Sequence, residues 1–237
     1  DDYALEWKWD GIRVQVSCNG NERRLFSRTG DDISNSFPEI IEDIKFNGVL
    51  DGELLVVKDK KVAPFNKLQQ RLNRKNVSDK LISDFPGHVR LYDILFDGQE
   101  DLRSNNFKYR RSRLEQFVAQ NKLQRMDLSE FVEFNVRDNL NDLHTACRES
   151  GLEGLMLKPW GSSYVAGRPK PGWFKWKRDP LMIDTVMMYA QRGHGRRSSF
   201  YSDFTFGVWR TNDGNIELVP VAKAYFGFTD DELKELD

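Results

Sequence analysis

The chain has 237 residues, of which 39% are hydrophobic, and its 36 basic residues nearly balance its 37 acidic ones. This composition suits a soluble protein with a packed core and allows one large or two modest domains. Cys18 and Cys147 are far apart and lack metal-ligand spacing, which argues against a disulfide framework or a structural zinc site. The sequence shows neither a signal peptide nor a run of roughly 18 to 20 apolar residues, so we expect an intracellular protein with no membrane partner.

The first part of the chain reads as strands with helices between them. Apolar and turn signals predict strands at residues 4–8, 12–18, 23–27, 48–57, 88–97, 153–159 and 173–179. Helical patterns cover residues 34–45, 65–75, 105–120 and 138–151. In the first of these, Phe37, Ile40, Ile41 and Ile44 share one face, and Ser36 is a predicted N-cap.

The pattern changes after Pro180. Residues 182–192, 204–210 and 216–226 are β-rich segments joined by Gly, Ser and Asn turns, without a long helix. We therefore expect two domains, at residues 1–180 and 181–237, the second being a barrel that three strands are too few to close.

Two strands carry charged side chains in unusual places. In "GVLDGELLVV" the carboxylates of Asp51 and Glu53 share a face, and both faces of the strand are otherwise apolar. Buried carboxylates need cations, a metal or ligand hydroxyls, unless Asp51 and Gly52 simply form a hairpin turn. In "WFKWKRD", Lys175 and Lys177 share a face with Trp173, which suits a polyphosphate, although a solvated edge strand gives the same pattern.

Six short motifs follow one another in an order that a known family shares. They are "KWDGIR" (8–13), "SRTG" (27–30), "LDGEL" (50–54), "LYDILFDG" (91–98), "EGLMLKP" (153–159) and "WFKWK" (173–177). This series resembles the covalent nucleotidyltransferase superfamily, and within it the ATP-dependent DNA ligases of the bacterial repair type. The resemblance implies an α+β fold: an ATP-grasp-like nucleotidyltransferase (adenylation) domain of antiparallel sheets flanked by helices, followed by the truncated N-terminal part of an OB-fold β-barrel.

The resemblance also implies a chemistry for Lys8. Its amine would attack the α-phosphate of ATP, release pyrophosphate and hold AMP covalently. A lysine amine is almost entirely protonated at neutral pH. We expect a desolvated slot between Trp7 and Trp9 to favour its neutral form.

The other implied roles follow the motifs position by position. Catalysis would involve Lys8, Asp10, Lys175 and Lys177. The nucleotide would be bound by Glu6, Arg13, Arg28, Glu53, Tyr92, Leu155, Lys175 and Lys177. In this set Arg13 and Glu53 hold the ribose, Tyr92 and Leu155 cover the two faces of adenine, and the lysine pair neutralises the triphosphate. Glu153, helped by Asp10, would place Mg²⁺.

Nicked duplex DNA is the implied partner of a monomeric enzyme in the bacterial cytoplasm or nucleoid, acting in replication, repair and recombination. Basic residues outnumber acidic ones seven to one from Arg103 to Arg125 and eight to two from Gly167 to Arg197. Such runs bind phosphates, though more often they form a solvated helix face. The predicted DNA contacts are Arg110, Arg111, Arg113, Arg192, Arg196 and Arg197.

Three alternatives remain open at this point. The motifs are shared with RNA ligases and with mRNA guanylyltransferases, and the basic stretches also fit a nucleic-acid-binding fragment without catalysis. An NAD-dependent ligase is disfavoured, because its cofactor-specific domain before the nucleophile is not present. A further family motif near the end of the OB domain is also missing, so we expect the 237 residues to be a fragment of a longer ligase.

Overall fold

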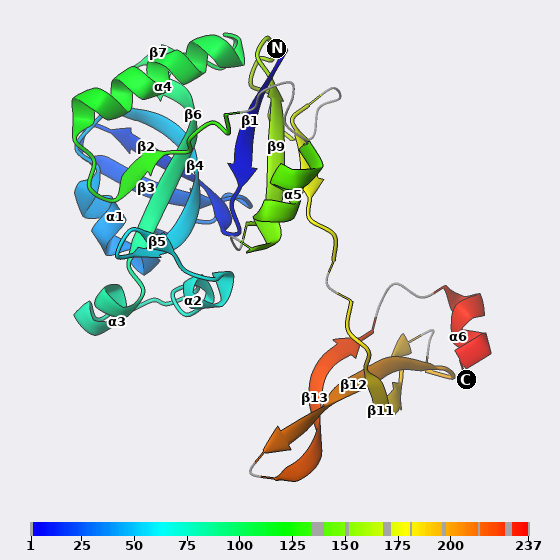
Figure 1. Ribbon diagram of the computed structural model, residues 1–237. Helices are drawn as coiled ribbons and strands as arrows, with labels where there is room; N and C mark the ends of the chain where they lie inside the picture. Colours follow the sequence, from blue (N-terminus) through cyan, green and yellow to red (C-terminus); the bar gives the residue numbers. More distant parts are fainter. Residues whose placement is uncertain are drawn as a thin grey trace. The chain divides into compact units, whose positions relative to one another are not determined.

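The computed structural model describes residues 2–133, 140–149, 152–167, 172–180, 182–195, 198–212, 214–225 and 229–236. The chain divides into two compact units, residues 1–178 and residues 179–237. Each unit has its own antiparallel sheet structure (Figure 1). Among the described helices, none has the length and apolar character needed to cross a membrane.

The larger sheet of the first unit has the strand order β3-β2-β4-β6-β7, with β5 paired to β4 and β8 to β6. Its strands are β2 (Ile12–Asn19), β3 (Glu22–Ser27), β4 (Gly48–Lys58), β5 (Lys61–Val62), β6 (Gly87–Asp97), β7 (Glu100–Asp101) and β8 (Met126–Leu128). All pairs are antiparallel except β6 with β8. The core forms on this sheet because Val14, Leu50 and Ile94 are buried on strands that pack against α1 (Pro38–Asp43) and α4 (Phe107–Asn121).

A second sheet of the first unit has the order β1-β9-β10, in which β1 (Tyr3–Lys8) lies beside β9 (Gly154–Pro159), as Figure 1 shows. The third strand is β10 (Phe174–Lys177). One face of this sheet packs a small apolar cluster of Leu155 and Leu152 against Cys147 of α5 (Leu140–Glu149). The opposite face is thereby left for polar side chains.

Three shorter elements complete the first unit: a 3₁₀ turn at Ser34–Ser36, α2 (Phe65–Gln69) and α3 (Asp79–Asp84). The predicted helix at 34–45 is thus shorter than expected. Its N-cap is Phe37 without a side-chain cap, while the Ser36 hydroxyl donates to the carbonyl oxygen of Arg74 at 2.9 Å. The predicted cap at Ser36 is therefore wrong.

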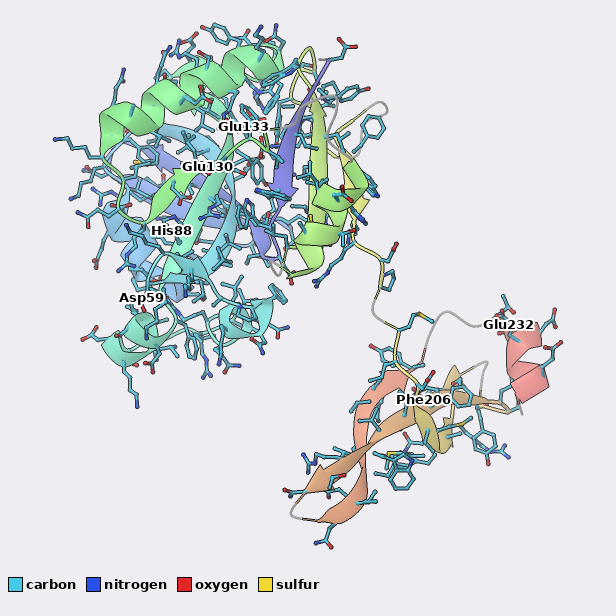
Figure 2. The ribbon with its side chains drawn as sticks, viewed as in Figure 1. Asp59, His88, Glu130, Glu133, Phe206 and Glu232 are labelled. Carbon is cyan, nitrogen blue, oxygen red and sulfur yellow. The ribbon has the colours of Figure 1, made fainter. Side chains whose placement is uncertain are left out.

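The second unit is an antiparallel sheet of β11 (Val186–Arg192), β12 (Tyr201–Asn212) and β13 (Asn215–Ala224), followed by α6 (Asp230–Leu236). Figure 2 shows the side chains of both units, with His88 labelled on β6 and Phe206 on β12. The whole chain is thus a mixed α/β protein with antiparallel sheets, as predicted.

Candidate active site

The polar face of the β1-β9-β10 sheet brings the predicted nucleophile together with the predicted lysine pair. Lys8 on β1 and Lys177 on β10 are both in register with Gly154 of the central strand. Because side chains alternate along a strand, Glu6 lies on the same face as Lys8, and Lys175 on the same face as Lys177.

Glu153, just before β9, joins the two outer strands. Its Oε2 accepts from the Lys8 ammonium and its Oε1 pairs with the Lys177 ammonium. Burial opposes ionisation of Glu153, but the hydrogen bonds from Lys177 and Lys8 outweigh it and hold the pKa of Glu153 below its ordinary value. Glu153 is therefore a carboxylate at neutral pH, clamped between two cations.

Gly154 makes this close approach possible. Its φ is +145°, a conformation that L side chains rarely adopt, and a Cβ there would overlap the carbonyl oxygen of Trp176 on β10. A glycine at this position therefore lets β10 approach β9 directly beside Glu153.

Glu53 on β4 and Arg13 on β2 are paired in register in the larger sheet. Their side chains lie close to Lys8 and Glu153 of the smaller sheet. Burial raises the pKa of Glu53 to about 7; Lys8 and Arg13 oppose this rise, whereas Glu153 and Asp10 add to it. These mutual effects require the five charged groups to be close. The site thus lies where the two sheets of the first unit meet.

Asp51 is a functional candidate that the sequence reasoning left without a role. It is fully buried on β4 and accepts from the Arg13 guanidinium, whose second hydrogen bond goes to the Tyr164 hydroxyl at 2.7 Å. Burial raises the pKa of Asp51, with Arg13 opposing it. The alternative of a hairpin turn at Asp51 and Gly52 is wrong, because both residues lie inside the eleven-residue strand β4.

Lys175 and Arg28 add further positive charge. Burial lowers the pKa of Lys175, and the like charges of Lys8, Arg28 and Lys177 lower it further. Arg28 also lines a hollow of about 270 Å³ together with Arg13 and Tyr164. Arg28 thus belongs both to this hollow and to the group of cations around Lys175, and such a group of cations suits a polyphosphate.

Tyr92 lies on β6 at an irregularity in its pairing with β4. Its ring contacts the Lys158 ammonium, 4.6 Å from the ring centroid, and meets the Trp173 ring edge-on at 6.1 Å. Burial raises the pKa of Tyr92 well above its ordinary value, as do the nearby charges of Asp51 and Glu53. Tyr92 therefore stands beside the charged groups, within reach of both sheets.

The predicted contact of Leu155 with adenine is wrong. Leu155 is fully buried in the apolar cluster on the α5 side of the sheet. Met156, in register with Glu6 and Lys175 and only partly buried, lies on the polar face instead. Strand alternation predicted that Leu155 shares a face with Glu153. This failed because Gly154, which lies between the two residues, has a positive φ and interrupts the regular strand.

The predicted slot of two indoles around Lys8 is also wrong. Trp7 alternates with Lys8 on β1, and both Trp7 and Trp9 pack against the cluster on the α5 side. Trp9 further stacks under the guanidinium of Arg90, 4.0 Å from the ring centroid. The surroundings of Lys8 are thus charged side chains.

The basic helix α4 does not offer the predicted DNA contacts at Arg110 and Arg111. Arg110 is fully buried and makes two hydrogen bonds to the carboxylate of Asp93, at 2.8 and 2.9 Å. Arg111 is 5% exposed and donates to the carbonyl oxygen of Ser129 at 2.7 Å. Both guanidinium groups are therefore committed inside the protein, and the prediction for them is wrong.

For the remaining basic residues, contact with DNA phosphates stays a prediction. Arg113 is partly exposed and pairs with Asp97 and with Glu100. Arg192 is exposed on β11, with its guanidinium 5.4 Å from the centroid of the Tyr201 ring. Arg196 and Arg197 lie outside the described residues.

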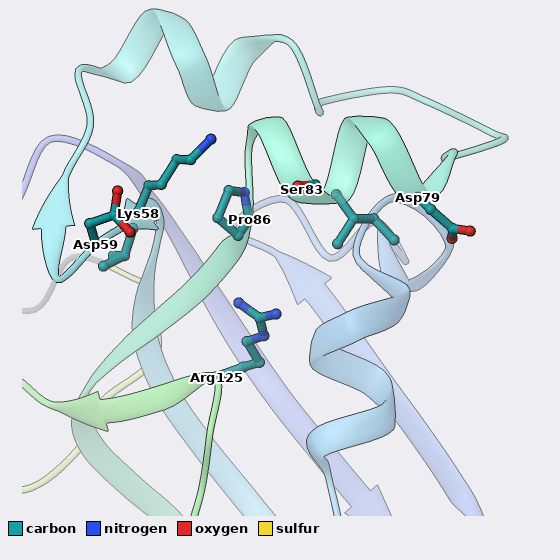
Figure 3. A pocket seen from close by; sticks show the side chains of 8 residues that line it. Lys58, Asp59, Asp79, Ser83, Pro86 and Arg125 are labelled. Atoms are coloured by element: carbon teal, nitrogen blue, oxygen red, sulfur yellow. The ribbon is translucent and has the colours of Figure 1, made fainter.

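A second hollow, of about 460 Å³, lies between the β4–β5 turn and α3 (Figure 3). Lys58, Asp79, Pro86 and Arg125 are among its lining residues, and none of the predicted site residues lines it. It is therefore separate from the candidate active site.

Comparison with known proteins places this geometry in a family. The sequence profile of the family described as ATP dependent DNA ligase domain matches residues 1–177. A probable DNA ligase of Koribacter versatilis is 34% identical, with 98% of this chain and 44% of that protein aligned. A DNA ligase of Archaeoglobus fulgidus is 31% identical, with 98% of this chain and 42% of that protein aligned. The chain thus spans less than half the length of these relatives.

Solved structures agree in fold. The crystal structure of the ligase domain from M. tuberculosis LigD has a TM-score of 0.58 and 26% identity, covering 99% of this chain and 70% of that one. A structure named Pmar-Lig_PreS3 has a TM-score of 0.72 at 22% identity, covering 98% of this chain and 54% of that one. With a family profile that covers three quarters of its length, the chain belongs to the ATP-dependent DNA ligase family.

Proposed function

We propose that the chain performs the nucleotidyl transfer of an ATP-dependent DNA ligase, with Lys8 as the residue that becomes linked to AMP. The observation that carries this proposal is the meeting of Lys8, Glu153 and Lys177 across Gly154, opposite the half-buried Glu53. A lysine amine beside further cations and carboxylates fits attack on a phosphate.

In the first step the Lys8 ammonium, which pairs with Glu153, releases a proton to water. The resulting neutral amine attacks the α-phosphorus of ATP, and the nitrogen loses a second proton to water as the phosphoramidate forms. A nitrogen–phosphorus bond forms, and the bond between the α-phosphorus and the pyrophosphate oxygen breaks. Lys175 and Lys177 stabilise the charge on the departing pyrophosphate, and Arg28 lies close enough to Lys175 to share this role. The incoming polyphosphate offers Lys177 a stronger anion than Glu153, and the attack uses the Lys8 nitrogen, so both partners of Glu153 are withdrawn and its carboxylate becomes available to other ligands.

The nucleotide's sugar and base would lie between the sheets. Glu53 accepts from a ribose hydroxyl, and Arg13, fixed by Asp51 and Tyr164, donates to the sugar or phosphate. Tyr92 stacks on one face of the base, while Met156 takes the covering role predicted for Leu155. The partial burial of Met156 on the polar face supports this assignment.

The acidic residues fit Mg²⁺ in a limited way. In the described part of the chain, no three His, Cys, Asp or Glu residues gather in metal-binding geometry. In phosphoryl-transfer sites Mg²⁺ is commonly held by one or two carboxylates together with phosphates of the substrate. Glu153 and Asp10 would supply the carboxylates here. When bound, Mg²⁺ would withdraw electron density from the phosphate and neutralise its charge.

In the later steps AMP passes from Lys8 to the 5′-phosphate at a nick in duplex DNA, and the 3′-hydroxyl then displaces AMP. Arg113, Arg192, Arg196 and Arg197 are the candidate phosphate contacts. In this proposal residues 1–180 form the adenylation domain and residues 181–237 begin an OB fold. The three antiparallel strands of the second unit support that assignment. The protein would act as a soluble monomer in DNA replication, repair or recombination.

Covalent labelling tests the proposal. The protein is incubated with Mg²⁺ and either ATP or GTP carrying a labelled α-phosphate, and its mass is measured. We expect a gain of one AMP from ATP, lost in Lys8→Ala and kept in Lys80→Ala, which removes an exposed lysine from α3. Label from GTP alone would instead indicate a guanylyltransferase, and a Lys8→Ala protein that gains AMP equally would refute the role of Lys8. Sealing of nicked RNA but not nicked DNA would indicate an RNA ligase.

A further inference from the structure

One face of the larger sheet carries a row of charged side chains that crosses four strands beside the candidate active site. Glu53 on β4 is in register with Arg13 on β2 on one side and with Arg90 on β6 on the other. Arg90 is in turn in register with Asp127 on β8. Residues in register on neighbouring strands point to the same face of a sheet. The mechanism above uses the first two members of this row and leaves Arg90 and Asp127 without a role.

The Arg90 guanidinium is fixed by the Asp127 carboxylate. Its Nε donates to Asp127 Oδ1 at 3.2 Å, and its Nη2 donates to Oδ2 at 3.4 Å. His88 Nε2 lies 3.2 Å from the same Oδ2. Burial opposes ionisation of Asp127, but His88 and Arg90 outweigh it and hold the pKa of Asp127 below its ordinary value. A guanidinium that makes two hydrogen bonds to one carboxylate is held in a defined orientation.

In this orientation the guanidinium lies over the indole ring of Trp9, with its central carbon 4.0 Å from the ring centroid. Tryptophan is the most favourable ring for such a contact with a cation. The indole is held at two further points. Its Nε1 donates to the hydroxyl of Ser129 at 3.3 Å, and its ring packs against the apolar cluster on the α5 side of the smaller sheet. Trp9 is thus in contact with both sheets of the first unit.

Trp9 occupies the place where the chain passes from one sheet to the other. It follows Lys8, the last residue of β1, in the short turn that leads to β2. The Lys8 carbonyl oxygen accepts from the backbone N–H of Glu153 at 2.8 Å, which ties it to the smaller sheet. Further along the turn, Gly11 lies so close to β4 that an added Cβ would be 2.4 Å from the Leu54 carbonyl oxygen. The contacts of Trp9 therefore set how Lys8 is presented to the groups of the larger sheet.

We infer that Arg90 is a positioning residue for the Lys8 nucleophile. By stacking on Trp9 it holds the turn in the arrangement from which the Lys8 amine reaches the α-phosphate, and Asp127 fixes Arg90 in that place. Arg90 itself touches no reacting atom in this scheme. The inference rests on the proposed function, because it concerns the step that links Lys8 to AMP. A displacement of about 1 Å between reacting groups can lower a rate by about a hundredfold.

The test measures the rate of covalent labelling by ATP over a range of ATP concentrations. In Arg90→Gln we expect the rate constant at saturating ATP to fall by about tenfold to a hundredfold. The KM for ATP, and the rise in melting temperature that ATP causes, should stay close to the wild-type values, since the proposed nucleotide ligands are unchanged. A loss of folded protein would lower the amount labelled and not the rate constant. Arg90→Lys should recover part of the rate, because it keeps a cation over the indole but not the paired hydrogen bonds.

Arg103→Gln is the matched control. Arg103 also pairs with a carboxylate, that of Asp101, and also lies over a ring, that of Phe96, at 4.9 Å. Its loss should leave the labelling rate unchanged. An Arg90→Gln protein in which only the KM for ATP changes would identify Arg90 as a nucleotide ligand and overturn the inference.

A double-variant cycle tests whether Arg90 acts through Trp9. Trp9→Leu should slow labelling, and Trp9→Phe, which keeps a ring under the guanidinium, should slow it less. In Arg90→Gln/Trp9→Leu the loss should not exceed the larger single loss, because both changes remove the same contact. Losses that multiply, or a folded Arg90→Gln protein with the wild-type rate, would overturn the inference and leave the proposed function standing. A wild-type protein that ATP does not label would overturn both.

Discussion

Glu53 is a candidate ribose ligand whose ionisation lowers the stability of the folded protein. Burial raises its pKa from the ordinary 4.5 to about 7, and the nearby carboxylates of Glu153 and Asp10 add to the rise. The folded protein therefore holds a proton on Glu53 more tightly than the unfolded chain does. Stability from this group is highest below pH 4.5 and falls as the pH rises toward 7.

The magnitude follows from that difference. A change in pKa from 4.5 to about 7 corresponds to a cost of about 3 kcal/mol once both states are ionised. Glu53→Gln removes the charge with little change in volume. We therefore expect it to raise the free energy of unfolding by up to about 3 kcal/mol at pH 8 and to change it little at pH 4.5.

Urea unfolding at pH 4.5 and pH 8, followed by tryptophan fluorescence, measures this effect. Five of the six tryptophans lie in residues 1–178, so the signal reports mainly the first unit. Glu42→Gln, which neutralises an exposed acid, is the matched control and should show no such pH dependence. The same Glu53→Gln protein should lose most covalent labelling by ATP, because the ribose contact is weakened.

A Glu53→Gln variant that is less stable than the wild type at pH 8 would refute the reasoning. It would mean that the attraction of Glu53 to Lys8 and Arg13 exceeds its burial cost. An equal gain at both pH values would also refute it, because the gain would then be unrelated to ionisation.

Three further predictions separate packing from function. Arg110→Ala should lower the free energy of unfolding by roughly 3–5 kcal/mol, because it leaves the buried carboxylate of Asp93 unpaired. Arg113→Ala, which removes a partly exposed side chain, should lower it by less than about 1 kcal/mol. Urea unfolding of both variants measures the difference. Gly154→Ala should abolish covalent labelling by ATP while the circular dichroism of the remaining fold persists, because a Cβ there forces β10 away from β9; normal labelling would contradict it. Met156→Ala should raise the KM for ATP with little loss of stability. Leu155→Ala should instead lower the free energy of unfolding by about 2–5 kcal/mol and leave the KM unchanged. The reverse pattern would assign the contact with the base to Leu155.

Motif order and strand alternation predicted several of the charged side chains that the structure brings close together. Alternation within β4 and β10 placed Asp51 with Glu53 and Lys175 with Lys177. The structure brings Glu53 and the two lysines close to Lys8, while Asp51 pairs with Arg13. Alternation works there because each strand runs without interruption through the paired residues. It failed at Leu155 because a glycine at positive φ precedes it, and a single such residue reverses the faces.

The DNA-contact predictions for Arg110 and Arg111 on α4 failed for a different reason. Counting arginines does not reveal their partners, and the carboxylate of Asp93 that pairs with Arg110 lies on a strand 17 residues away. A signal was nevertheless present in the sequence. Phe107, Arg110 and Leu114 recur at helical spacing and are all buried, so the helix period placed this arginine on the core face. Periodicity, applied before charge, would have excluded it.

The cluster of cations makes a last prediction that requires no turnover. Partial burial and the like charges of Lys8, Arg28 and Lys177 lower the pKa of Lys175, and Glu153 opposes this effect. A polyanion that binds there removes the repulsion, so tripolyphosphate should raise the melting temperature, and added salt should weaken the effect. Lys175→Ala should gain less melting temperature from the anion than the wild type does, while Lys80→Ala should gain as much as the wild type. If Lys175→Ala gains as much from tripolyphosphate as the wild type, the anion binds elsewhere, and the lysine pair is not the polyphosphate site.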